Sequence, residues 1–139
     1  MLTLAAGGSA RPVKGETLAT AQDIPVKFLE NILLDLRRAG LVASQRGAEG
    51  GYRLNRAPQE ISVAEVIRAV DGPLANIRGV RPEQVGYQGP AEPLQRVWIA
   101  MRAALRSVLE AVTLADVAAG TLPPAIEKLT ADPDAWAPH

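Results

Sequence analysis

The stretch IPVKFLENILLDLRRAGLVASQRGAEGGYRL, residues 24–54, decides the fold because two different hydrophobic periods follow each other in it. Its first half repeats apolar residues at spacings of three and four, which predicts an amphipathic helix over residues 25–39 with one buried face. The repeated residues are Val26, Leu29, Leu33 and Leu36. Gly40 is the expected end of the helix. Residues 41–45 and 52–54 are typical of short strands, and the glycine-rich loop between them predicts a β-hairpin.

A shorter helix is expected just before this stretch, from Lys14 to Gln22, with Leu18 and Ala19 as its apolar contact. Asp23 follows it at the place of a tight turn, since aspartate tolerates left-handed backbone. Residues 1–6 are compatible with the end of one more helix, which GGSARP interrupts. Short helix, tight turn, amphipathic helix and hairpin together predict a mainly α winged helix-turn-helix, with the hairpin as its wing.

This order of elements predicts DNA binding. A recognition helix buries one face and offers polar side chains to base edges. A wing needs glycines for close approach to phosphates or the minor groove, and a cation, which Arg46 supplies. Taken alone, an amphipathic helix is usually just a packed helix, and a glycine-rich hairpin is usually just a turn. The prediction therefore depends on the order of the elements.

Composition favours a globular protein and gives little support to enzyme chemistry. Hydrophobic residues make up 47% of the 139 residues, and there is no membrane-spanning run or signal pattern, so a soluble cytoplasmic protein is expected. The chain has no cysteine and one histidine, His139, which excludes disulfides, thiolate metal sites and a cysteine nucleophile. The acidic residues are scattered and give no clear catalytic pair. GAEGG precedes a strand, whereas the glycine-rich loops that bind phosphates precede a helix. We expect neither an enzyme nor a bound cofactor.

The net charge is zero, which argues against a strongly basic nucleic-acid binder. Residues 1–60 contain eight basic and six acidic residues, and residues 61–139 contain seven and nine, so the two parts carry about +2 and −2. A dimer would double this weak asymmetry. An adaptor with the same fold that binds protein and not DNA remains the alternative.

The second half of the chain predicts a capped helix, a loop and a long helix. Ser62 and Glu65 form a capping box before a helix to about Val70, whose apolar face is Val63, Val66, Ile67 and Val70. Residues 72–93 contain four prolines and four glycines, which predicts a loop. A helix of some twenty residues is then expected from Leu94, with the spacing of a coiled-coil seam that pairs in a homodimer. The seam comprises Leu94, Trp98, Met101, Leu105, Val108 and Val112.

Packing of this helix across its own domain is the alternative to dimerisation. The predicted organisation is a DNA-binding domain over residues 1–71, a linker over 72–93, dimerisation elements over 94–130, and a tail over 131–139.

Two blocks of the sequence carry a resemblance to a known family. Residues 24–54, followed by ISVAEVIRAVDG at 61–72, resemble the Rrf2 family of bacterial transcription regulators. The later run SVLEAVTLADVAAG is similar to the dimerisation helix of the family and the short helix after it. The resemblance covers about residues 13–122. It implies a homodimer on an imperfect palindrome, with the recognition helix in the major groove and the wing in the minor groove.

The resemblance also implies which residues face DNA. They are Lys27, Phe28, Glu30 and Asn31 on the recognition helix, Arg46 on the wing, and the wing glycines Gly47, Gly50 and Gly51. Glu30 can accept a hydrogen bond from a cytosine amino group. Phe28 stands where tyrosine is common in the family, so a hydroxyl contact is lost and the ring can simply pack.

The chain departs from the family pattern in two places. It begins inside the first helix of the family, so either its start is truncated or the long helix contributes more to dimerisation. Many members hold an iron–sulfur cluster through three cysteines in the loop before the long helix, and residues 72–93 contain none. We therefore expect a repressor without a cluster, which responds to an unknown small-molecule or protein effector. Trp98, Tyr87, Arg78 and Arg81 can line an effector site, and an ordinary surface loop is the alternative.

Overall fold

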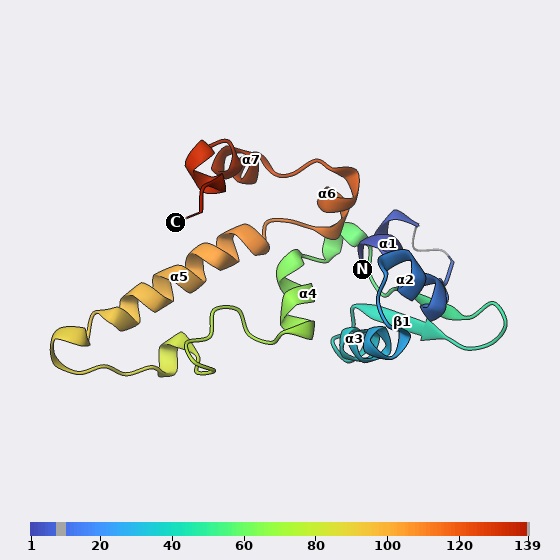
Figure 1. Ribbon diagram of the computed structural model, residues 1–139, viewed down its shortest axis with the longest axis horizontal. Helices are drawn as coiled ribbons and strands as arrows, with labels where there is room; N and C mark the ends of the chain where they lie inside the picture. The colour runs from blue at the N-terminus through green and yellow to red at the C-terminus, as the bar shows by residue number, and fades with distance from the viewer. Residues whose placement is uncertain (8–10, 139) are drawn as a thin grey trace.

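A computed structural model describes residues 1–7 and 11–138, and shows a head that carries a hairpin and a long helix that projects from it (Figure 1). Residues 8–10 of the predicted interruption, and His139, lie outside the described residues. The helices are α1 (Leu2–Ala6), α2 (Gly15–Gln22), α3 (Val26–Arg38), α4 (Val63–Val70), α5 (Leu94–Leu109), α6 (Leu114–Ala119) and α7 (Pro124–Thr130). The strands are β1 (Val42–Gln45) and β2 (Gly51–Leu54). Short 3-10 turns are η1 (Pro58–Glu60), η2 (Pro82–Gln84), η3 (Gly89–Ala91) and η4 (Pro133–Trp136).

The predicted order of helix, turn, helix and hairpin is confirmed. Asp23 is left-handed, with φ 51° and ψ 45°, and the amide of Ile24 donates to the carbonyl of Ala19 at 3.0 Å. Leu29, Leu33 and Leu36 of α3 are buried, as the spacing predicts. Val26 is the exception, because it lies in the first turn and its side chain is 43% exposed. The buried face of α3 is therefore one residue shorter than the periodicity indicated.

The hairpin pairs β1 and β2 in antiparallel register, from Val42 opposite Leu54 to Gln45 opposite Gly51. A third segment extends this sheet, because Val13 and Tyr52 exchange both backbone hydrogen bonds at 2.8 Å. The segment that leads into α2 thus lies against the outer edge of β2. This contact ties the wing to the start of the helix-turn-helix.

The core of the head forms where α1, α2, α3, the hairpin and α6 meet. Leu41, Leu54 and Ile61 are almost completely inaccessible to solvent. The other members of this buried cluster are Leu4, Leu18, Ala19, Leu29, Leu33, Leu36, Val42 and Leu114. Leu114 belongs to α6, so an element from the predicted dimerisation segment completes the core of the head.

The capping box of α4 is confirmed. The Ser62 hydroxyl accepts from the Glu65 amide at 3.2 Å, and the Glu65 carboxylate accepts from the Ser62 amide at 2.9 Å. The predicted apolar face of α4 is not buried in the core, however; Ala64 is the buried residue of this helix. The predicted residues line one side of a cavity instead, and the described elements cover them only in part. They are Val63, Val66, Ile67 and Val70.

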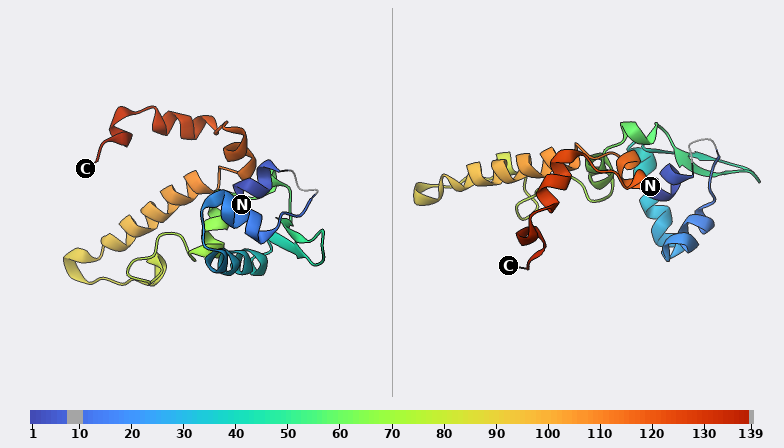
Figure 2. Two further views of the ribbon diagram at one scale, coloured as in Figure 1. Left: turned by 45° about the vertical axis from the view of Figure 1, so that its right-hand side comes forward. Right: turned by 90° about the horizontal axis from the view of Figure 1, so that it is seen from above.

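The long helix is shorter than predicted and stands free of the head (Figures 1 and 2). It ends at Leu109, and none of its residues is buried. Val112, the last residue of the predicted seam, lies beyond the helix and is itself buried against the head, where its carbonyl accepts from the Val63 amide at 2.9 Å. The prediction that the helix continues to Val112 was wrong, because the chain turns after Leu109 to begin α6.

The loop over residues 72–93 runs back along α5 and is attached to it by side chains. The Trp98 indole donates to the Tyr87 hydroxyl at 3.0 Å, Gln95 donates to the Glu83 carbonyl at 3.3 Å, and Arg102 pairs with the Glu83 carboxylate. Within residues 1–7 and 11–138, no helix is both long and apolar enough to cross a membrane.

Candidate nucleic-acid interface

The outward side of α3 carries the residues that were predicted to face DNA. Lys27, Phe28, Glu30 and Asn31 are all exposed, and Phe28 is 60% exposed, so its ring does not pack into the head. The opposite side of the helix is anchored in the core by three leucines. Exposed donors and acceptors on a rigid helix are the side chains that read base edges in a major groove.

Leu34 was missed by the sequence reasoning. It lies seven residues after Lys27, which places it on the same side of α3, and it is exposed. An outward apolar side chain on this side can contact the methyl group of thymine. The spacing from Lys27 was the signal that could have found it.

The wing presents Arg46 and Gly47 at the start of the loop between the two strands. Arg46 is exposed, and among the described residues it makes no ion pair. Gly47 has φ +104°, and a Cβ added there would meet no atom within 4 Å. This end of the loop is therefore open to a close approach from outside.

The other two wing glycines are explained by the hairpin itself. Gly50 is buried, and a Cβ there would overlap the backbone carbonyls of Gln45 and Gly47. At Gly51, φ is +152° and a Cβ would overlap the carbonyl of Val13. Both positions thus require glycine for internal packing.

We predict that Gly51→Ala lowers the free energy of unfolding by about 2–3 kcal/mol, because it adds an overlap with Val13 to a strained φ. Gly47→Ala is the matched control, since it also has a positive φ but free space around it, and it should cost about 1 kcal/mol. Urea denaturation of the two variants measures the difference. Equal losses would show that the Val13 contact does not constrain this glycine.

Two polar contacts hold the wing base against the helices. The Asn55 amide group donates to the Gly40 carbonyl at 3.0 Å, which ties the end of β2 to the end of α3. Arg56 donates to the Glu65 carboxylate of α4 at 2.5 Å. Hydrogen bonds from the Ser62 backbone and from Arg56 lower the pKa of Glu65, so this carboxylate is charged at neutral pH. These contacts fix the wing relative to α3.

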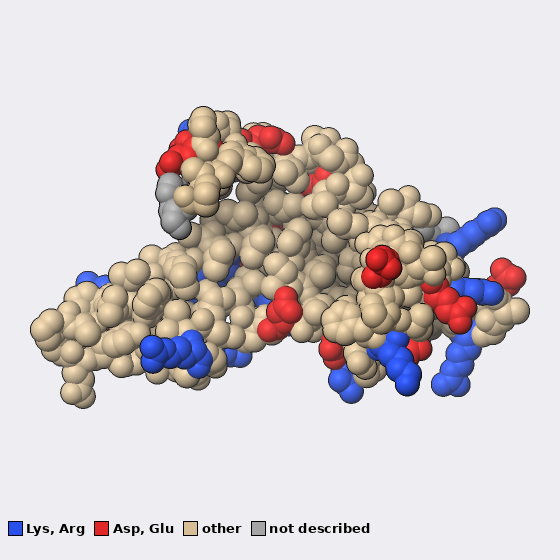
Figure 3. All heavy atoms as spheres, viewed as in Figure 1, with Lys and Arg blue, Asp and Glu red and all other residues tan. Residues whose placement is uncertain are grey.

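On the face shown in Figure 3 the head carries charges of both signs, and the long helix carries arginines. The middle of the face in Figure 3 is mostly uncharged. The local charge of the wing and α3 therefore matters more for an anionic partner than the net charge of the chain, which is zero.

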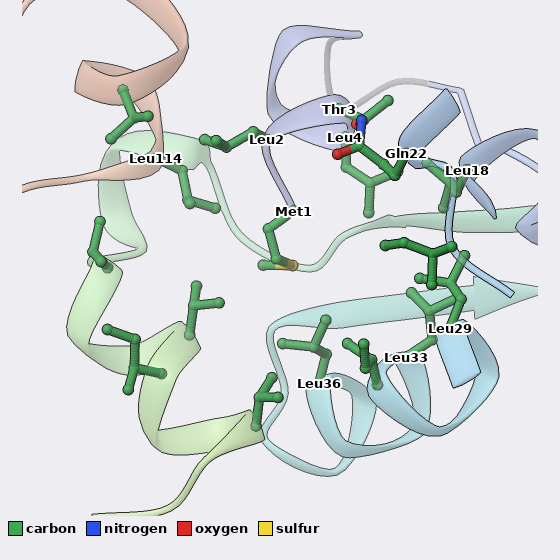
Figure 4. Close-up of a pocket in the computed structure, with 17 residues that line it drawn as sticks. Met1, Leu2, Thr3, Leu4, Leu18, Gln22, Leu29, Leu33, Leu36 and Leu114 are labelled. Atoms are coloured by element: carbon green, nitrogen blue, oxygen red, sulfur yellow. The ribbon is translucent and has the colours of Figure 1, made fainter. Parts of the chain in front are cut away.

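Behind α3 lies an apolar cavity of about 520 Å³, walled by α1, α2, α3, α4 and α6 (Figure 4). Leu29, Leu33 and Leu36 of α3 form one side of it, and Leu114 of α6 lies near the opposite end. Thr3 and Gln22 are its polar side chains, and no charged side chain lines it. Such a cavity can hold apolar groups but offers no side-chain acid or base.

Comparison with known proteins agrees with this geometry. The Rrf2 family model, described as an iron-dependent transcriptional regulator, matches residues 1–120. Rv1287 of Mycobacterium tuberculosis (strain H37Rv), named as an HTH-type transcriptional regulator, is 50% identical over 132 residues, which are 95% of this chain and 82% of that protein. CymR of Bacillus subtilis, the global cysteine regulator, has a solved structure with a TM-score of 0.70 and 34% identity, covering 86% of this chain and 88% of that one. IscR of T. potens gives a TM-score of 0.67 at 29% identity, covering 98% and 87%.

The description of the family names iron, and the donor set of this chain does not fit an iron–sulfur cluster. Such clusters are held mainly by cysteine thiolates, and the chain has no cysteine. Among the described residues, no three histidine, aspartate or glutamate side chains gather as a metal site either. The absence of a cluster stays a prediction.

We predict that anaerobically purified protein is colourless, contains no stoichiometric iron or sulfide, and binds DNA equally with and without reductant. The physical reason is the lack of thiolates, which such clusters and thiol switches both need. Absorption spectra with iron and acid-labile sulfide assays check the first part. A visible band with matching iron and sulfide, or redox-dependent DNA binding, would contradict it.

Proposed function

The chain belongs to the Rrf2 family of transcriptional regulators, and from this premise we propose that it is a homodimeric repressor of a palindromic operator. The recognition helix α3 enters the major groove through Lys27, Phe28, Glu30 and Asn31, and Arg46 and Gly47 of the wing reach the minor groove. Gly50 and Gly51 support the hairpin from inside. The relatives are transcriptional regulators, not enzymes.

The observation that carries the proposal is the exposed polar side of α3 on the same rigid head as Arg46 of the wing, which forms no ion pair with the residues that the structure describes. α3 is fixed by three buried leucines, and the wing base is fixed by Asn55 and Arg56. Sites built on such rigid elements hold their side chains in register with base edges and phosphates.

The homodimer is supported by apolar surface that a single chain leaves uncovered. Leu94, Met101 and Leu105 of the predicted seam are all exposed on α5, and the cavity behind α3 is open as well. Exposed apolar patches of this kind are typical of interaction sites. Trp98 and Val108 of the seam are half-buried. A two-fold dimer through the five seam residues from Leu94 to Val108 would place two heads on one operator.

Binding to random duplex DNA tests the proposal first. A regulator should bind weakly, with a Kd on the order of 10⁻⁴–10⁻⁶ M at physiological salt, and lose roughly 10³-fold or more in affinity between about 50 and 200 mM salt. Fluorescence anisotropy of a labelled duplex measures this slope. If DNA binding is absent at low salt, the chain is instead an adaptor that works through protein contacts.

Selection from a random DNA pool then identifies the operator. We expect two half-sites about 10–10.5 base pairs apart, or a multiple of that, related by two-fold symmetry. A promoter that contains the selected sequence should be less active when the protein is present. Higher activity would contradict the repressor role but not the DNA-binding role.

A further inference from the structure

We infer that Glu110 is a positioning residue: held by Arg68 of the head, it fixes the angle of α5 and thereby the separation of the two heads in the dimer. The inference rests on the homodimer proposed above and deepens it. It concerns side chains at the junction of the head and the long helix that are not among the residues proposed to face DNA.

The first part of this junction is a backbone bridge. The Val63 amide donates to the Val112 carbonyl, and the Leu114 amide donates to the Ile61 carbonyl, both at 2.9 Å. α4 and α6 begin together here, because their N-caps, Ser62 and Thr113, face each other in the bridge. A pair of adjacent hydrogen bonds fixes where the segment between α5 and α6 meets the head. These two bonds by themselves do not set the direction of α5.

The second part is a cluster of charged side chains around Glu110. Glu110 follows the last residue of α5, and its carboxylate accepts hydrogen bonds from Arg68, in the last turn of α4, and from Arg106, one turn earlier on α5, at 3.0 Å. Among residues 1–7 and 11–138, Arg68–Glu110 is the one ion pair between the head and this end of α5. Hydrogen bonds lower the pKa of Glu110, the one from Arg106 most and the one from Arg68 next, so Glu110 is charged at neutral pH.

Apolar packing between α5 and the head is limited. No residue of α5 is buried, and Val108 and Leu109, at the end next to the head, are half-buried. α4 also carries Glu65, one turn before Arg68, and Glu65 pairs with Arg56 at the wing base. The short helix α4 therefore connects the wing base to α5. A rotation of α5 relative to α4 changes the angle between α5 and the wing.

A small angular change at the junction is large enough to matter on DNA. α5 has 16 residues and is roughly 24 Å long, so a rotation of about 10° moves its far end by roughly 4 Å. One base pair corresponds to about 3.4 Å along the helix axis. Half-exposed ion pairs are individually weak, so we expect a change in the spread of angles and not a loss of the fold.

Distances between spin labels in the dimer test the inference directly. The chain has no cysteine, so Thr20→Cys on the exposed side of α2 gives one label in each head. The parent should give a narrow distance distribution, and both Glu110→Gln and Arg68→Gln should broaden or shift it. Glu83→Gln is the matched control, since it breaks another ion pair to α5, with Arg102, that does not touch the head. An unchanged distribution in Glu110→Gln, or an equal change in Glu83→Gln, would overturn the inference.

Operator spacing gives the second readout. The selected operator is compared with versions that have one base pair inserted or removed between the half-sites. Glu110→Gln and Arg68→Gln should reduce the preference of the parent for its own spacing by about two- to thirtyfold, the range expected for such a coupling. Binding to a single half-site should not change. Equal losses on all spacings would indicate general destabilisation and overturn the positioning role.

The two readouts separate this inference from the function it rests on. If the protein is a dimer but selects no DNA sequence, the proposed regulator function is contradicted. The distances between the spin labels still decide the role of Glu110 in that case. A parent that is monomeric in solution overturns the homodimer and the inference together. A dimer that binds its operator with unchanged spacing preference in Glu110→Gln overturns the inference alone.

Discussion

Leu105→Glu should weaken dimerisation by about 100- to 1,000-fold and abolish tight operator binding, because it places an unpaired charge in an apolar interface on both chains. Leu105 lies in the last half of α5 and is 40% exposed in the single chain, so the substitution is tolerated within one chain but not between two. Sedimentation should show monomers or aggregates in place of dimers. Each head alone can then bind only one half-site.

Ala103→Glu is the matched control for this experiment. Ala103 is exposed on the same helix, and two positions turn the side chain by roughly 200° around the helix axis, away from the seam. It should remain dimeric and keep operator binding. A parent protein that sediments as a monomer at micromolar concentration would contradict dimerisation through the seam. An Ala103→Glu variant that dissociates as readily as Leu105→Glu would contradict it too.

Arg46→Ala should weaken operator binding by about 1–3 kcal/mol for each half-site, since the wing loses its cation for the phosphates or the minor groove. The loss applies twice in a dimer. The salt dependence should also fall by about one counterion for each lost phosphate contact. Arg96→Ala is the matched control, because Arg96 is exposed on α5, away from the head, and should leave both quantities nearly unchanged.

Glu30→Ala separates base reading from charge. A carboxylate close to DNA phosphates discriminates between bases but does not attract the DNA. Its removal should therefore relax base preference without weakening binding to random DNA. Repeating the DNA selection with this variant measures the preference. Operator binding equal to the parent in both Arg46→Ala and Glu30→Ala, with an unchanged circular-dichroism spectrum, would contradict the proposed interface.

Local sequence was sufficient for the helix-turn-helix and the hairpin. The spacing of leucines in α3, the tolerance of Asp23 for left-handed backbone, and the Ser62–Glu65 capping box all act within a few residues of the chain. Such signals depend on backbone geometry that is nearly independent of the rest of the protein. The exposed side of α3 follows from the same spacing, since the buried leucines fix its opposite side.

The reasons for particular residues required the tertiary structure. Gly51 is explained by the carbonyl of Val13, which is 38 residues away in sequence and appears in no local pattern. Val66 and Ile67 have the period of a buried face, yet they line an open cavity and the described elements cover them only in part. Periodicity indicates which side of a helix is apolar, but not whether anything packs on it.

The sequence by itself thus determined the reading head, because its elements are specified by short-range steric and capping preferences. Only the tertiary structure decided where α5 ends and that Val112 is buried in the head. A heptad pattern predicts a helix for as long as its apolar residues recur. The helix α5 nevertheless ends just before the bridge, in which Val63 bonds to Val112 and Leu114 bonds to Ile61. Long-range hydrogen bonds and burial compete with local helix preference there, and the long-range contacts prevail because they bury Val112 and Leu114 in the head.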